Sequence, residues 1–476
     1  MTENPQPRKQ DQESTYSGEA LEFIKKIEGL ALKLVNFEFG DTFNLWKFQL
    51  DLLELQREIQ KSVSEEKKRA KKLKGKSESL KELQMARWLA RRLGDSLAWT
   101  LLRFDTGSIY PFANNDPVPI AQKSHGSEGM LAVSAHLAKE GWGFPLLHDV
   151  TDVMRIGDVT FIKPENRHRT IEVKTRHLGT TTDRDGKTST QYDVAISFLG
   201  SRDSKLELEI DADRASAVGD QEMQPLNIPE KEQLRADRRI AQQTRRMANV
   251  LTLKEADLDT VFEVDGKKTI ATRLDTPSES KWSAIRALID EAKNEGYAST
   301  ALDSSCMYVA LYNKHGITPD LAKNEQIAHD VKRIVSSSGK HQNSLTLSMI
   351  PEEGGRGAHL YLPFYLYDIP PEAIADLIHG RLLIIALVNA GSVATLIEQD
   401  GVEVTLPPGK DPLSSMTFSY IATDGHGNRY RAEVHELGLH VREYIYEFRG
   451  IDYLRGIVHG MRGTFRTVAD QGFIGD

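Results

Sequence analysis

The chain has 476 residues, a hydrophobic fraction of 39% and a formal net charge of −8 at pH 7. Its length exceeds one ordinary hydrophobic core and predicts about two to four domains. The acidic balance excludes a surface that binds nucleic acid everywhere, so nucleic-acid binding would need local basic patches. The single cysteine, Cys306, excludes an intramolecular disulfide and zinc fingers built on cysteine pairs.

The N-terminal part is predicted to be a helical region that follows a polar tail. Residues 1–17 lack the apolar core of a signal peptide and are expected to be disordered. In residues 18–105 apolar side chains recur mostly at steps of three and four, which is the spacing of amphipathic helices.

Residues 65–76 form a dense block of lysine and arginine between the helical stretches. Such a block can bind a phosphate backbone. It can also be a solvated helix end that runs into a flexible connection at Gly75, and this is the interpretation that we favour. A third interpretation is an αα-hairpin arm that packs on a partner subunit.

The expected central domain, residues 106–250, begins with a helix and a short strand. Apolar residues at helical spacing predict a helix over 127–138, with Gly141 as its stop. Glu128 lies at the start of this helix, where the positive end of the helix dipole stabilises an acid whether or not it has a further role. Residues 143–147 then predict the first strand.

Two further strands carry acids that can converge. Asp158 opens the apolar strand 156–162, and Glu172 and Lys174 stand two residues apart on the next strand. Side chains alternate along a strand, so Glu172 and Lys174 share a face while Val173 points into a core.

The polar, proline-containing residues 163–169 predict a hairpin loop that folds Asp158 back beside Glu172. Hard cations prefer oxygen ligands, and Mg²⁺ takes one or two carboxylates while it keeps waters and substrate phosphate oxygens. A lysine beside the metal can orient the attacking water and offset charge that develops on phosphorus. The alternative is an ordinary hairpin with polar residues on its wet face.

This order of elements resembles the PD-(D/E)XK nuclease superfamily, the restriction-endonuclease-like fold. The resemblance covers roughly residues 124–175, with a possible extension to about residue 250. One departure is Gly157, which stands where the family name implies proline.

The resemblance implies an αβββαβ core that hydrolyses DNA. Asp158 and Glu172 would bind Mg²⁺, for which Mn²⁺ would substitute, and Glu128 would be an additional ligand. Lys174 would assist the water.

The family also places a basic or glutamine-bearing helix after the core strands. Residues 233–247 predict a strong helix rich in arginine. Its alternative interpretation is a solvated surface helix. The candidate phosphate contacts are Arg238, Arg239, Gln242, Arg245 and Arg246. Ahead of it, residues 192–199 predict another strand, and the loop 179–190 is a candidate mobile flap.

Beyond residue 250 the pattern predicts a mixed α/β linker domain, 251–342, and a mixed, β-rich recognition or assembly domain, 343–476. A capping-box signature at Thr276 predicts a helix that ends at Gly296. Cys306 lies in a predicted buried strand, where a core role is favoured over a nucleophilic one. The remaining expected elements are a short helix from Pro370 and strands at 344–347, 359–367, 382–388, 393–397 and 416–422.

The fold class expected from these patterns is a multidomain α+β or α/β protein. The expected function is a Mg²⁺-dependent endonuclease that hydrolyses DNA phosphodiester bonds in restriction, antiviral defence or repair. We expect it to be cytoplasmic, without a membrane segment, and to act as a homo-oligomer or within a larger defence complex. The first alternative is a non-catalytic nucleic-acid-binding or scaffold protein with a nuclease-like fold. The second is an unrelated enzyme whose site lies in the C-terminal third, at His426, His435 and His440.

Overall fold

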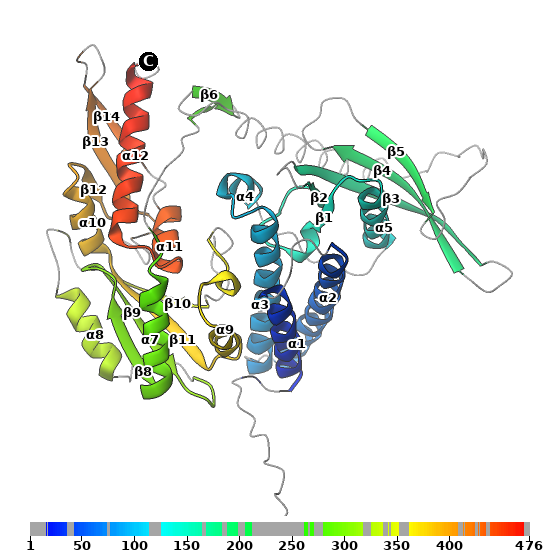
Figure 1. Ribbon diagram of the computed structural model, residues 1–476, viewed down its shortest axis with the longest axis horizontal. Coiled ribbons are helices and arrows are strands. Elements are labelled where there is room, and N and C mark those ends of the chain that lie inside the picture. Colours follow the sequence, from blue (N-terminus) through cyan, green and yellow to red (C-terminus); the bar gives the residue numbers. More distant parts are fainter. Residues whose placement is uncertain are drawn as a thin grey trace, which may run out of the picture. The chain divides into compact units, whose positions relative to one another are not determined.

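The fold is a mixture of α-helices and antiparallel β-sheets (Figure 1). It comes from a computed structural model. Contacts divide the chain into two compact units, one of residues 1–35, 70–88 and 272–476 and one of residues 36–69 and 89–271. The structure describes residues 16, 18–35, 42–73, 77–113, 125–163, 168–182, 188–198, 205–211, 261–264, 267–270, 279–317, 325–336, 341, 344–351, 361–407, 413, 415–423, 427, 429–434 and 438–470.

The unit of residues 36–69 and 89–271 contains helices and a five-stranded sheet. Every strand pairs antiparallel with its sequence neighbour, in the order β1-β2-β3-β4-β5. The strands are β1 (Phe144–Leu147), β2 (Val159–Ile162), β3 (His168–Thr182), β4 (Thr188–Phe198) and β5 (Lys205–Asp211). A separate hairpin joins β6 (Val261–Val264) and β7 (Lys267–Ile270).

The helices of this region form because apolar residues recur on one side of each. Along α3, for example, Leu89, Leu93 and Leu97 stand four residues apart and are fully buried. The helices are α2 (Thr42–Leu73), α3 (Glu78–Leu101), α4 (Thr106–Ala113) and α5 (His125–Lys139). The predicted helix at Glu128 and the predicted first strand are therefore confirmed as α5 and β1.

The expected αβββαβ order is present only in its first part. After β3 the chain turns directly into β4, so no helix separates the third strand from the fourth. The expected flap at 179–190 is mostly strand, because β3 runs to Thr182 and β4 starts at Thr188. The expected arginine-rich helix, 233–247, lies outside the described residues.

The unit of residues 1–35, 70–88 and 272–476 has a four-stranded antiparallel sheet in the order β10-β11-β9-β8. The side chains of Met307, Val309, Leu387 and Ile385 cover one face of it and pack against Ile327 and other residues of a helix. Cys306 is fully buried in β9, which confirms its core position. The elements are α1 (Gly18–Val35), α7 (Trp282–Glu295), β8 (Tyr297–Ala301), β9 (Cys306–Tyr312), the packing helix α8 (Glu325–Val335), β10 (Leu345–Ile350), α9 (Pro371–Ile378) and β11 (Leu382–Asn389).

The same unit continues with helices around a three-stranded sheet, β12-β13-β14. These elements are α10 (Ala390–Glu398), β12 (Glu403–Thr405), β13 (Thr417–Thr423), β14 (Arg429–Val434), α11 (Gly438–Tyr446) and α12 (Ile451–Asp470). The predicted helix at Pro370 and the predicted strands at 344–347, 382–388 and 416–422 are confirmed in this unit.

Two expected strands were wrong, and one expected helix starts later than predicted. The expected strand 393–397 is helix α10, because the Asn389 side chain accepts hydrogen bonds from the main-chain N–H groups of Gly391 and Ser392 and caps a helix. The described part of the expected strand 359–367 contains the 3₁₀ helix Phe364–Leu366. The helix predicted to end at Gly296 is confirmed as α7, with Gly296 as its left-handed C-cap. Its start differs from the prediction, since α7 begins at Trp282 and Ser280 forms a β-bridge with Arg449. Thr276 itself lies outside the described residues.

Candidate active site

The β2–β3 hairpin brings Asp158 against the strand that carries Glu172. The main-chain N–H of Asp158 donates to the carbonyl of Ile171 over 2.9 Å. The main-chain N–H of Val173 donates to Oδ2 of Asp158 over 2.7 Å. The Asp158 residue is thus hydrogen-bonded to the residues on both sides of Glu172, as the hairpin prediction required.

The turn that delivers Asp158 depends on a glycine. Gly157 has a φ angle of +79°, in the region that favours glycine over residues with a Cβ. A glycine at the position where the family name implies proline is therefore explained by local geometry, since proline fixes φ near −65°.

Glu172 is buried, with a relative exposure of 3%. This differs from a hairpin whose polar side chains lie on a wet face. Val173 is also buried, as expected for the core-facing neighbour. Lys174 occupies the β3 position opposite Ala195 of β4, and its side chain lies outside the described part of the structure.

Glu128 lies in the first turn of α5, and α5 packs against β3. Among the described residues, no three His, Cys, Asp or Glu side chains form a group that could hold a metal ion. The structure therefore pairs Asp158 with the Glu172 segment but does not gather Glu128 with both as a three-ligand set. Asp158 and Glu172, on adjoining segments of the hairpin, supply carboxylate oxygens, and Mg²⁺ takes one or two carboxylates and fills its remaining positions with water and phosphate oxygens.

A buried histidine, His148, fixes the Asp158 turn, and no sequence pattern pointed to it. His148 Nδ1 lies 3.0 Å from the carbonyl oxygen of Gly157, and Nε2 lies 2.8 Å from the hydroxyl of Thr160. Thr160 in turn lies 2.7 Å from the hydroxyl of Thr170 on β3. Because a carbonyl can only accept, Nδ1 carries the proton and Nε2 accepts from Thr160. The main-chain N–H of His148 also donates to the carbonyl of Asp158 over 3.0 Å.

Burial lowers the pKa of His148 to about 4, which keeps the ring neutral at neutral pH. A neutral ring with a donor on one side and an acceptor on the other ties the Asp158 turn to β2 and β3. Its role is therefore to position the turn.

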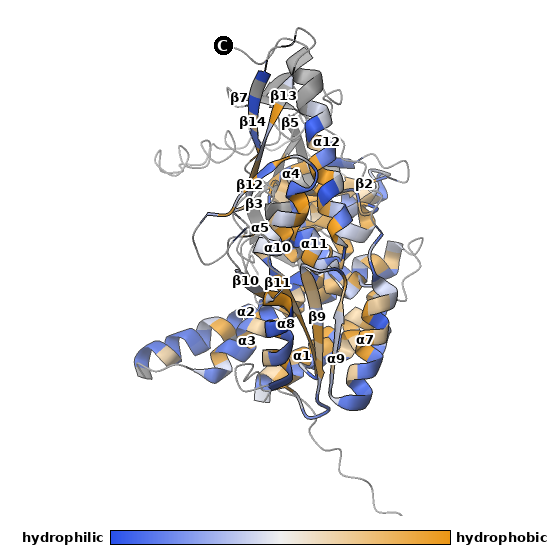
Figure 2. Ribbon diagram, turned by 90° about the vertical axis from the view of Figure 1, so that its left-hand side faces the viewer, coloured by the Kyte–Doolittle hydropathy of each residue, from blue (hydrophilic) through white to orange (hydrophobic). Residues whose placement is uncertain are grey.

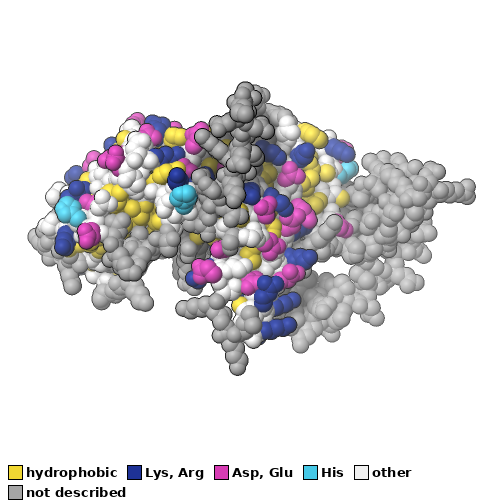
Figure 3. Space-filling model, turned by 90° about the horizontal axis from the view of Figure 1, so that it is seen from below, with side chains coloured by type: hydrophobic (Ala, Val, Ile, Leu, Met, Phe, Trp, Pro, Cys, Tyr) yellow, Lys and Arg dark blue, Asp and Glu magenta, His cyan; other side chains and the backbone are white. Residues whose placement is uncertain are grey.

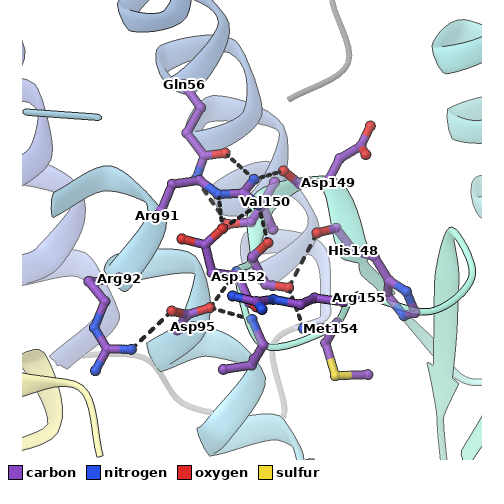
Figure 4. A network of polar contacts seen from close by, with 12 residues as sticks. Gln56, Arg91, Arg92, Asp95, His148, Asp149, Val150, Asp152, Met154 and Arg155 are labelled. Carbon is purple, nitrogen blue, oxygen red and sulfur yellow. Dashed lines mark hydrogen bonds and ion pairs between the residues drawn. The ribbon is translucent and has the colours of Figure 1, made fainter. Parts of the chain in front are cut away.

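Side chains of helix α3 form a buried network of hydrogen bonds and ion pairs with the segment between β1 and β2 (Figure 4). The Arg91 guanidinium donates to the carbonyls of Asp149 and Thr151 and forms an ion pair of 2.8 Å with Asp152. Arg91 and Asp152 thus join the helix to the segment that leads to Asp158.

Asp95 of α3 forms a second set of hydrogen bonds with the same segment. Its Oδ1 accepts from the main-chain N–H groups of Asp152 and Val153 over 2.6 and 2.9 Å, and Arg92 donates to Oδ2 over 3.1 Å. Burial raises the pKa of Asp95 to about 6, although Arg92 opposes the rise. The carboxyl is fully buried, so its oxygens depend on these partners.

Helix α2 holds the same region through two glutamines. Gln56 Nε2 donates to the carbonyls of Ala90 and Val150 over 3.0 and 2.9 Å. The Gln49 amide donates to the carbonyl of Pro145 and accepts from the N–H of Leu147, at 2.8 and 2.9 Å. The amide of Gln49 therefore pairs with β1 as a neighbouring strand would.

The other residues proposed from the sequence are not gathered at this site. The candidate DNA contacts Arg238, Arg239, Gln242, Arg245 and Arg246 lie outside the described residues, as do His426 and His435. His440 Nδ1 lies 3.0 Å from Oε2 of Glu443 and 3.2 Å from the hydroxyl of Tyr453. His440 therefore contacts residues of α11 and α12.

Comparison with family models, curated proteins and solved structures finds no match for this chain. The interpretation of the site therefore depends on its residues and geometry.

Two surface properties follow from the described residues. On the face shown in Figure 3, lysine and arginine side chains are interspersed with aspartate and glutamate, in keeping with the acidic total charge. No helix in the described ranges has both the length and the apolar character needed to cross a bilayer.

Proposed function

We propose that this chain is a Mg²⁺-dependent nuclease that hydrolyses DNA phosphodiester bonds at the β2–β3 hairpin. The observation that carries the proposal is the hydrogen bond from Val173 N–H to the Asp158 carboxylate, beside buried Glu172. Asp158 and Glu172 place carboxylate oxygens on adjoining segments of the hairpin, and carboxylate oxygens are ligands that Mg²⁺ prefers.

The chain's own residues divide the work. Asp158 and Glu172 would hold the cation, which would stabilise negative charge on the phosphoryl oxygens. Lys174, two residues beyond Glu172 on β3, orients the water whose oxygen forms the new bond to phosphorus, and this water gives a proton to solvent. The P–O bond to the leaving end of the strand breaks, and the leaving oxygen takes a proton from solvent. Glu128, at the start of α5, forms no three-ligand group with Asp158 and Glu172 among the described residues, and it would act on the cation through a bound water.

A buried scaffold supports this assignment. Catalytic groups need to be held closely by neighbours whose own geometry is fixed. Asp95 and Arg91 of α3 hold the segment 148–158 from outside, and His148 ties it internally to Gly157. The proposal also includes DNA as the substrate, a homo-oligomer or a larger defence complex as the assembly, and the cytoplasm as the location.

Plasmid nicking tests the proposal. In Mg²⁺ the wild-type chain should convert supercoiled plasmid to the open circle, and EDTA should stop it. Asp158→Asn should abolish nicking, because it keeps an acceptor for Val173 N–H but removes the charge. Lys174→Ala should abolish it too, and Glu128→Gln should have a smaller effect. Glu140→Gln, a change of an exposed acid in the turn after α5, is the control and should leave nicking unchanged. Equal nicking by wild type and Asp158→Asn would contradict the proposal.

A second candidate function is a non-catalytic nucleic-acid-binding or scaffold protein with the same hairpin. It is favoured by the engagement of one Asp158 oxygen with a main-chain N–H, which is a structural use of a carboxylate. The two functions separate in one comparison. A nuclease nicks DNA in Mg²⁺ and loses this in Asp158→Asn, whereas a scaffold binds DNA equally in both forms and nicks in neither.

A further inference from the structure

The last turns of α2 carry a face made of lysine. Lys67, Lys68, Lys71 and Lys72 are all exposed. An α-helix turns about 100° per residue, so this spacing places the four side chains within an arc of about 140°. We call these four residues the lysine face.

The opposite side of the same helix is buried. Ile59, Val63 and Glu66 stand three or four residues apart and have exposures of 0%, 0% and 8%. These positions point about half a turn away from the lysine face. Figure 2 shows hydrophilic colours along this end of α2. The helix therefore packs through its apolar side and presents the lysines outward.

Among the described residues, the four lysines have no acidic partner within ion-pair distance. Elsewhere a lysine pairs with an acid one turn before it, as in Lys25 with Glu22 at 3.0 Å and Lys81 with Glu78 at 2.8 Å. Arg69, which lies among the four, pairs with Glu66 at 2.9 Å. Within the part of the chain that the structure describes, none of the four lysines forms an ion pair.

The arrangement places like charges next to each other. Lys67 and Lys71 are four residues apart, and so are Lys68 and Lys72, so each pair repels on one face of the helix. The negative end of the helix dipole favours cations in the last turn, but Lys67 and Lys68 lie a turn earlier. A polyanion on this face would remove the repulsion and release counterions from its own charges.

We propose that the lysine face of α2 binds the sugar–phosphate backbone of DNA. The proposal rests on the proposed function in so far as DNA is the substrate, and it assigns a surface that holds this substrate without reading its sequence. Lysines on phosphates fix position and contribute affinity that depends on salt, while base edges carry the sequence information.

Salt-dependent binding of the full-length chain to a short DNA duplex in EDTA tests the proposal without cleavage. Fluorescence anisotropy between about 50 and 200 mM salt gives the slope of log Kd against log salt concentration. Changing all four lysines to glutamine should reduce this slope by about 3 to 4, since each phosphate contact contributes ~0.9. Changing all four to arginine should keep the slope, because the charge remains. Replacing Lys25, Lys26, Lys33 and Lys81 with glutamine removes the same formal charge elsewhere and should leave the slope unchanged.

The outcomes are distinct. A slope in the glutamine variant equal to that of wild type overturns the proposal, even where Mg²⁺-dependent nicking is found. A reduced slope in the glutamine variant, together with no nicking by the wild-type chain in Mg²⁺, supports DNA binding by the lysine face and contradicts the nuclease assignment. Unchanged DNA binding with lost binding to vesicles that contain phosphatidylserine would assign the face to a membrane and overturn the proposal. Glutamine and lysine have similar helix propensities, so circular dichroism should show the same helicity in all variants.

Discussion

Gly94 of α3 lies against the main chain of Val150: a Cβ placed on Gly94 would stand 1.7 Å from the Val150 carbonyl oxygen. No side chain fits in that space, so the close approach of α3 to the segment before Asp158 requires glycine. The contact lets Asp95 and Arg91 of α3 reach the same segment.

Gly94→Ala should therefore destabilise the protein. Forcing a methyl group into a packed contact costs about 1–3 kcal/mol, so the melting temperature should fall by several degrees. Gly29→Ala is the matched control, because a Cβ at Gly29 on α1 would meet nothing within 4 Å. This control should be neutral or stabilising, as alanine favours helix over glycine by about 1 kcal/mol. Equal losses in both variants would show that close packing is not the cause.

Asp95 should make stability fall as pH rises. Burial raises its pKa from 3.8 to about 6 in the folded chain, so the folded state holds the proton that the unfolded state has lost. Its contribution is greatest below pH 3.8 and declines toward pH 6, by up to about 3 kcal/mol at ~1.4 kcal/mol per unit of pKa. Comparison of wild type with Asp95→Asn by thermal melts across this range isolates the effect. The stability advantage of wild type should shrink as pH rises, and a constant difference would contradict the assignment.

His148 should act in the opposite direction. Its pKa is lowered from 6.5 to about 4, so the unfolded state binds a proton that the folded state does not. The stability that it contributes is fully present above pH 6.5 and is lost as pH falls toward 4, again by up to about 3 kcal/mol. Melts of wild type and His148→Gln should differ most near neutral pH and converge in acid. Divergence in acid would mean that the ring is charged in the folded chain.

The sequence predicted the hairpin and its acids because these depend on local rules. Strand alternation and a polar, proline-containing break placed Asp158 beside Glu172 without knowledge of the rest of the chain. Helix periodicity and a terminal glycine did the same for α5. The strand pattern and the helix pattern each depend on residues close together in the chain, so both can be recognised in a single sequence.

The supports of the site could not be predicted in the same way. Asp95 and Asp152 stand far apart along the chain, and nothing local to either indicates that they meet. His148 was passed over because an isolated histidine in an apolar stretch does not reveal its partners. The burial of Glu172 likewise depends on what covers the sheet.

Two errors have different physical causes. Residues 393–397 contain valine, threonine and isoleucine, which favour strands, yet Asn389 caps a helix there. The Thr276 signature favoured a helix start, yet pairing of Ser280 with Arg449 delays α7 to Trp282. In the first case the helix cap directly before the segment decided the outcome, and in the second case a pairing with a residue distant along the chain did.

Metal-dependent thermal stabilisation tests the central claim most directly, since it needs neither DNA nor catalysis. A cation that binds only the folded chain raises the melting temperature with its concentration. Mg²⁺ or Mn²⁺ should raise the melting temperature of wild type and of Glu140→Gln, and should leave Asp158→Asn and Glu172→Gln unchanged. The same metal-dependent rise in all four proteins would contradict a cation shared by Asp158 and Glu172.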